Sequence, residues 1–141
     1  MNNTTRYARL DDLIRTIPPF ECVDGCADCC GPITMTPLEW KRIIERTGDH
    51  KLKDKMAKLM DDAFQGGQGH CPLLDPVKKK CTVYDIRPAI CVVYGSGNAE
   101  HLICPHGRKP EKPLTAEEVS VFMAQVDRLG LGRPSLLLKR V

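Results

Sequence analysis

The stretch Cys22-Val-Asp-Gly-Cys26-Ala-Asp-Cys29-Cys30 places four of the chain's eight cysteines within nine residues. Spacings of two or three residues form tight turns that direct neighbouring thiolates to one centre, and thiolate sets select zinc, copper(I) or iron–sulfur clusters. The alternative is unbound thiols, since a free cysteine packs like a small hydrophobic residue. Such dense clustering argues against that alternative for this block, which therefore predicts a metal centre.

The remaining four cysteines are widely spaced along the chain. They are Cys71, Cys81, Cys91 and Cys104, separated by 9, 9 and 12 residues. These spacings differ from the paired Cys-x2-Cys knuckles of structural zinc and favour iron–sulfur over zinc. Eight thiolates can fill two four-coordinate zinc sites, or hold one or two clusters. All eight are candidate ligands: Cys22, Cys26, Cys29, Cys30, Cys71, Cys81, Cys91 and Cys104.

Histidine is an occasional substitute for cysteine as a ligand, and His70, His101 and His106 leave that choice open. The Cys22-x3-Cys26-x2-Cys29 spacing also matches the cluster site of radical S-adenosylmethionine enzymes, but those enzymes need repeated strand–helix units that this chain lacks. The sequence contains no P-loop, dinucleotide glycine fingerprint or nucleophile elbow. We therefore assign no catalytic residue, and the sequence leans away from an enzyme without deciding the question.

Composition and charge indicate one small, loop-rich domain. The chain has 141 residues with eleven prolines, eleven glycines and a formal net charge of +3. No apolar run approaches the roughly 18–20 residues that span a bilayer, and the N-terminal residues lack the apolar region of a secretory signal. We expect a cytoplasmic protein, where structural disulfides are rare and clustered cysteines are more often metal ligands or catalytic groups.

The first half of the chain predicts two helices on either side of the cysteine block. Apolar residues at helical spacing indicate a helix over residues 5–17, which Pro18 stops because proline cannot donate to the helical ladder. A second helix begins at Thr36 with a capping box that Glu39 completes, and Gly48 ends it.

The middle of the chain predicts a helix and a hairpin. Asp49 is the expected cap of a third helix, and residues 70–84 alternate like two strands around a turn. The apolar face of the third helix comprises Leu52, Met56, Leu59, Met60, Ala63 and Phe64.

The last predicted elements are two helices. Asp85 is the expected cap of a short helix that runs through Cys91. Thr115 and Glu118 form a second capping box, and Gly130 closes the helix that follows. The fold class is therefore mainly α with a small β-hairpin, in a small, metal-organised, loop-rich cysteine-cluster domain. The expected organisation is one domain over 1–141, with a cysteine-cluster core at 20–106, an N-terminal helix at 1–19, and a C-terminal helix and tail at 107–141.

The cysteine block, together with Cys71-Pro-Leu-Leu-Asp and Cys81-Thr-Val-Tyr84-Asp-Ile-Arg87-Pro-Ala-Ile-Cys91, resembles the CxxCxxCC (YkgJ-like) cysteine-cluster family. The resemblance covers residues 20–106 and implies zinc or iron chelation, in some members through an iron–sulfur cluster. The first gap is three residues here rather than two, and Val92 stands where the family usually has arginine. The resemblance implies a ligand set and no reaction.

Two motif residues have candidate roles beside the thiols. Arg87 is a candidate cofactor-binding residue that neutralises an anionic, thiolate-rich centre, or else forms a surface salt bridge. Tyr84 is expected to pack in the core with its hydroxyl hydrogen-bonded.

The favoured hypothesis is a metal-binding protein that holds an iron–sulfur cluster, most simply [4Fe–4S], in a structural, redox or sensing role. The alternatives are a zinc-stapled module that docks a protein partner through its C-terminal helix and tail, and an enzyme with an open metal site. The basic run at Lys78–Lys80 and the small net charge are weak signals for nucleic acid, which we do not expect as a partner. We also expect no membrane partner.

Overall fold

The computed structural model describes residues 2–19, 31, 33–67, 69–98 and 102–130. Its elements are the helices α1 (Asn3–Ile14), α2 (Pro37–Thr47) and α3 (Leu52–Phe64), the strands β1 (Leu74–Asp75) and β2 (Lys80–Cys81), the 3₁₀ turn η1 (Tyr84–Ile86), and the helices α4 (Ala89–Val93) and α5 (Ala116–Leu129). The two strands pair antiparallel. The predicted fold class, mainly α with one small hairpin, is confirmed.

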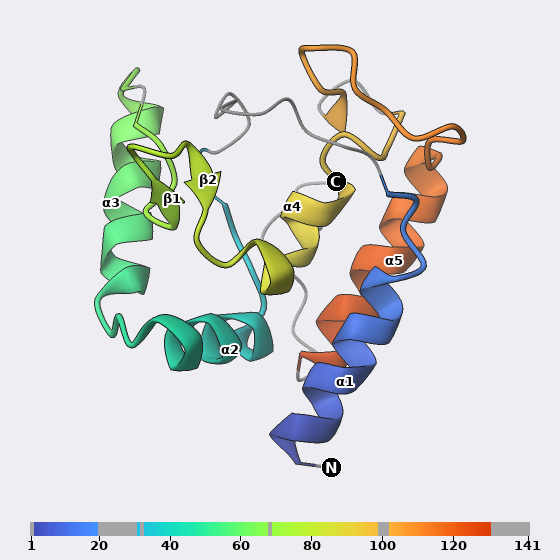
Figure 1. Ribbon diagram of the computed structural model, residues 1–141, viewed down its shortest axis with the longest axis horizontal. Helices are drawn as coiled ribbons and strands as arrows, with labels where there is room; N and C mark the ends of the chain where they lie inside the picture. The colour runs from blue at the N-terminus through green and yellow to red at the C-terminus, as the bar shows by residue number, and fades with distance from the viewer. Residues whose placement is uncertain (1, 20–30, 32, 68, 99–101, 131–141) are drawn as a thin grey trace.

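The helices form two groups joined through the middle of the molecule. Figure 1 shows α1 and α5 side by side and running in opposite directions, with α4 next to them, while α3 and the hairpin lie on the far side and α2 lies between. Within the described residues, no helix has the length and apolar character that a membrane crossing needs.

Both predicted capping boxes are confirmed. The Thr36 N–H donates to Glu39 Oε1 at 2.9 Å, and the Glu39 N–H donates to Thr36 Oγ1 at 3.3 Å. In α5 the same two bonds join Thr115 and Glu118 at 3.0 and 3.1 Å. Gly48 ends α2 with a φ of 68°, in the left-handed region that glycine adopts without a Cβ penalty.

The start of α3 differs from the prediction, which made Asp49 its cap. Lys51 occupies the N-cap position and provides no side-chain cap bond. Asp49 instead accepts from the Lys51 N–H at 3.0 Å and from Lys55 Nζ at 2.8 Å. On the predicted apolar face of α3, Leu52, Met56 and Leu59 are buried. Phe64, at the end of the helix, is 71% exposed.

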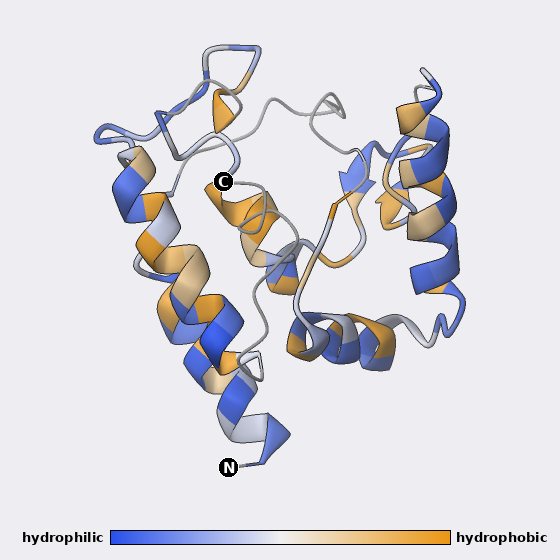
Figure 2. Cartoon of the chain, turned by 180° about the vertical axis from the view of Figure 1, so that it is seen from behind, coloured by the Kyte–Doolittle hydropathy of each residue, from blue (hydrophilic) through white to orange (hydrophobic). Residues whose placement is uncertain are grey.

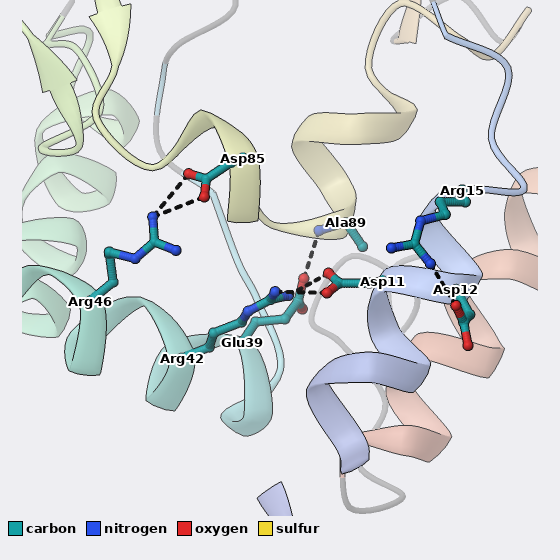
Figure 3. A network of polar contacts seen from close by, with 8 residues as sticks. All are labelled: Asp11, Asp12, Arg15, Glu39, Arg42, Arg46, Asp85 and Ala89. Atoms are coloured by element: carbon teal, nitrogen blue, oxygen red, sulfur yellow. Dashed lines mark hydrogen bonds and ion pairs between the residues drawn. The ribbon is translucent and has the colours of Figure 1, made fainter. Parts of the chain in front are cut away.

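The prediction that Asp85 caps a helix through Cys91 is wrong. The chain first makes the turn η1, and α4 begins only at Ala89, with Pro88 in the N-cap position. Asp85 is instead paired with Arg46 of α2, whose Nη1 lies 3.0 Å from both carboxylate oxygens (Figure 3). A partner 39 residues away in the sequence has replaced the local capping role.

Two hydrophobic clusters match the two groups of helices. The first joins α1, α4 and α5 and also includes Leu38 of α2, and Figure 2 shows α4 as apolar over most of its length. The second joins α2, α3 and the hairpin region. Buried members of the first cluster are Leu10, Ile17, Leu38, Ala89, Val92, Val93, Leu102, Phe122, Met123 and Val126; those of the second are Ile43, Leu52, Leu73, Val83 and Ile86.

A polar link connects α1 to α2 beside these clusters. Arg42 donates to both carboxylate oxygens of Asp11, at 2.8 and 2.9 Å, and its guanidinium lies 5.4 Å from the ring centroid of Tyr7. The Arg42 side chain is only 15% exposed, so this paired geometry is better protected from water than a surface salt bridge.

Candidate metal centre

The hairpin and α4 carry three of the four described cysteines. Cys81 ends β2 and pairs in register with Leu74 of β1, whose N–H donates to the Cys71 carbonyl at 3.0 Å. The Cys71 and Cys81 side chains pack against the second hydrophobic cluster. Cys91 lies in α4, where its N–H donates to the Pro88 carbonyl at 2.9 Å. All three thiols are free and half-buried.

The three thiols lie within range of one another's charges. Burial is the main cause that raises the pKa of Cys71, of Cys81 and, most strongly, of Cys91. Negative charge on Cys71 and on Cys81 raises the pKa of Cys91 further. Ionising all three together is therefore costly unless a cation is bound among them.

Three groups lower the pKa values of these thiols and so oppose the effect of burial. The backbone N–H of Leu73 lowers the pKa of Cys71, and that of Val83 lowers the pKa of Cys81. The charge of Arg87 lowers the pKa of both Cys81 and Cys91. Soft thiolates with N–H groups aimed at sulfur are the donor set of zinc and iron–sulfur centres, so these residues fit a bound metal.

Arg87 and Tyr84 form a stacked pair next to these thiols. The guanidinium carbon of Arg87 lies 4.2 Å from the ring centroid of Tyr84. The predicted core position of Tyr84 is wrong, because the residue is 50% exposed and its ring serves as a platform for the cation. The salt bridges among the described residues do not include Arg87.

The other candidate ligands are less defined by the structure. Cys104 is half-buried in a turn closed by the Gly107 N–H on its carbonyl at 3.1 Å. His70 and His106 are exposed. Among the residues that the structure describes, no three cysteine, histidine, aspartate or glutamate side chains meet in a geometry that would hold an ion. Lying outside the described residues are Cys22, Cys26, Cys29, Cys30 and His101.

One residue near this site was predicted only in part. The capping box predicts that Glu39 caps the start of α2, but Glu39 Oε2 also accepts from the Ala89 N–H of α4 at 2.6 Å. No local pattern signals this second bond, because its partners are 50 residues apart.

The structure is that of a mainly helical protein whose hairpin and α4 carry free, half-buried thiols, with the charge of Arg87 acting on two of them. Thiols are the donor groups of cysteine-based metal chelators. The family model CxxCxxCC, whose description reads "Putative zinc- or iron-chelating domain", matches residues 21–107. That span is more than half of the chain, and the chain belongs to this family. The match includes all eight cysteines and Arg87. No curated protein and no solved structure matches the chain.

Proposed function

We propose that this metal-chelating protein holds an iron–sulfur cluster, most simply [4Fe–4S], and acts in the cytoplasm in a structural, redox or sensing role. One observation carries the proposal: Cys71 and Cys81 pack against the same hydrophobic cluster, and the charges of both thiols and of Arg87 reach Cys91 in α4. A [4Fe–4S] cluster is most often held by four thiolates, which calls for a fourth ligand from the other cysteines. The block at Cys22–Cys30 is the natural source because its spacings are so short.

Charge balance supports a cluster at this position. A cluster with its four thiolates is a large anionic group, and its reduction potential depends on net charge, burial and hydrogen bonds to sulfur. The N–H groups of Leu73 and Val83 supply such bonds, and Arg87 supplies positive charge. Arg87 thus acts on the cofactor without being a ligand.

Ligand substitution tests the proposal directly. The variants Cys71→Ser, Cys81→Ser and Cys91→Ser are purified anaerobically, and metal and sulfide per chain are quantified. We expect each variant to lose most of the metal, because a serine hydroxyl replaces a soft thiolate. Val77→Ser is the matched control: Val77 lies between the two strands and is 88% exposed, so its metal content is expected to equal that of the wild type. Undiminished metal in all three cysteine variants would overturn the proposal.

A further inference from the structure

The two capping boxes of this chain are alike in chemistry and different in burial. Each joins a threonine to a glutamate three residues on through the same pair of bonds. Glu118 is exposed, as expected of a residue that only caps its own helix. Glu39 is 4% exposed, which is costly for a carboxylate unless it is well hydrogen-bonded. The burial of Glu39 therefore calls for a role beyond capping α2.

The carboxylate of Glu39 holds the first turns of two helices at once, and Figure 3 shows its bond to Ala89 of α4. Its Oε1 accepts from the N–H and the hydroxyl of Thr36 at 2.9 and 3.1 Å, and its Oε2 accepts from the Ala89 N–H at 2.6 Å. Pro88, in the N-cap position of α4, makes no side-chain cap bond. Glu39 thus supplies, from α2, the cap that α4 lacks.

The short helix α4 depends on such outside contacts. It has only five residues, and isolated helices of that length are not stable in water. Ala89, its first residue, is fully buried in the first hydrophobic cluster. Cys91 follows two residues later, within the same turn. Whatever fixes Ala89 therefore also fixes where the Cys91 thiol lies.

We propose that Glu39 is a positioning residue of the metal centre: by bonding the Ala89 N–H, it holds α4 so that the Cys91 thiol is placed to bind metal. This inference rests on the proposed function, in that Cys91 is taken as a ligand. It adds a residue of α2 to the supporting shell of the site. Outer partners of this kind orient the ligands that contact the metal.

The charge of Glu39 and its geometry act on Cys91 in opposite directions. Its negative charge raises the pKa of Cys91, but it is the weakest of the causes, behind burial and the charges of Cys71, Cys81 and Arg87. A neutral residue at position 39 would slightly favour the Cys91 thiolate, because a negative charge is removed. It would disfavour metal binding, because α4 would no longer be held in position. The charge of Glu39 is the weakest of the causes that act on the Cys91 pKa, and we expect the loss of position to decide the outcome.

Two matched variants separate positioning from capping. Glu39→Gln weakens the bridge to Ala89, and Glu118→Gln disturbs a capping box of the same design, whose bonds join Glu118 to Thr115 at the N-cap of its own helix. Metal-loaded protein is incubated with EDTA, and the rate of metal loss and the visible spectrum are followed. We expect Glu39→Gln to lose metal about 10- to 100-fold faster, with an altered spectrum, and Glu118→Gln to match the wild type.

The outcomes distinguish this inference from the proposed function. Equal rates and spectra for the two variants in a metal-loaded protein would overturn the role of Glu39 and leave the metal centre standing. A wild-type protein that holds no metal would overturn both.

Amide exchange of the wild-type protein gives a second test that does not depend on a variant folding. The Ala89 N–H is expected to exchange more slowly in the metal-loaded than in the metal-free protein. The reference is the Val119 N–H of α5, which donates to the Thr115 carbonyl at 3.0 Å. An unchanged ratio of the Ala89 rate to the Val119 rate would contradict the proposal, whether both rates stay constant or change together.

Discussion

The guanidinium of Arg87 lies 4.2 Å from the ring centroid of Tyr84, and its charge acts on the thiols of Cys81 and Cys91. Tyr84 is 50% exposed, so the stacked pair borders solvent. A planar guanidinium stacks on an aromatic face in a way that an ammonium group does not. The two motif residues therefore work as a pair, in which the tyrosine orients the arginine.

Removing the Arg87 charge is expected to weaken metal binding. Arg87→Met raises the pKa of Cys81 and Cys91, since the positive charge that favours their thiolates is lost. We expect about a tenfold loss of metal affinity in competition with a chelator, and a smaller loss for Arg87→Lys, which keeps the charge without the flat stack. The control is Arg15→Met, because Arg15 forms an exposed salt bridge with Asp12 at the end of α1. Equal affinity for Arg87→Met and Arg15→Met would contradict this role.

Local signals in the sequence predicted the starts of α2 and α5 and the end of α2, whereas α1 ends at Ile14 and not at the predicted residue 17. These local signals did not reveal bonding partners that are distant in the sequence. The bonds of the two capping boxes and the C-cap at Gly48 lie within a few residues, so their pattern is visible in the sequence. Asp49 and Asp85 carried the same kind of local signal, but Lys55 and Arg46 compete for their carboxylates. A capping residue is predictable only where no stronger partner reaches it.

The sequence predicted which residues belong to the candidate site, but it predicted their arrangement in space less well. The pattern of residues 70–84 predicted a hairpin that carries Cys71 and Cys81, and the hairpin is present. The approach of Cys91 depends on the α4 contact with Glu39, 50 residues away, which no spacing reveals. The first cysteine block lies outside the described residues, so its share in the site stays a prediction, as does the single-domain organisation.

The ion pair between Arg46 and Asp85 predicts a shifted acid titration. The hydrogen bond from Arg46 is the main cause that lowers the pKa of Asp85 from its ordinary value of 3.8. The stability that this pair contributes is therefore present above the ordinary pKa and is lost as pH falls through the lower, folded-state pKa. Arg46→Met should raise the pKa of Asp85 toward 3.8, which carboxyl NMR titration measures.

Asp75 is the internal control for that titration. Its pKa is also lowered, but by the backbone N–H groups of Lys78 and Val77. It should keep its low pKa in Arg46→Met. A pKa of Asp85 that does not respond to Arg46→Met would show that another group lowers it.

Substitution of Gly48 tests whether the end of α2 requires a residue that adopts a positive φ. The Gly48 φ of 68° lies in the left-handed region, and an added Cβ would meet no atom within 4 Å. The cost of Gly48→Ala is therefore one of conformation alone, and we expect about 1 kcal/mol of lost unfolding free energy in urea. Gly31→Ala, at an equally open position without positive φ, should be neutral or slightly stabilising. Equal effects of the two substitutions would refute this account of the helix end.

Substitution of Ile43 tests how much the second hydrophobic cluster, on which the hairpin cysteines pack, contributes to the stability of the fold. Ile43 is 0% exposed, and Ile43→Ala should lower the unfolding free energy by about 2–5 kcal/mol through lost burial and a cavity. The same substitution at Ile103, which is 51% exposed, should change it by no more than about 0.5 kcal/mol. Urea unfolding of the metal-free proteins measures both. Similar losses at the two positions would mean that this cluster does not carry the fold.

The most direct test of the proposed function is the metal content of wild-type protein purified without oxygen. Iron, acid-labile sulfide and zinc are quantified per chain, and the visible spectrum is recorded. A [4Fe–4S] centre held by the clustered cysteines predicts brown protein with broad absorption near 400 nm and about four iron and four sulfide per chain. Colourless protein with about one or two zinc per chain and no sulfide would contradict the cluster and assign the thiols to structural zinc.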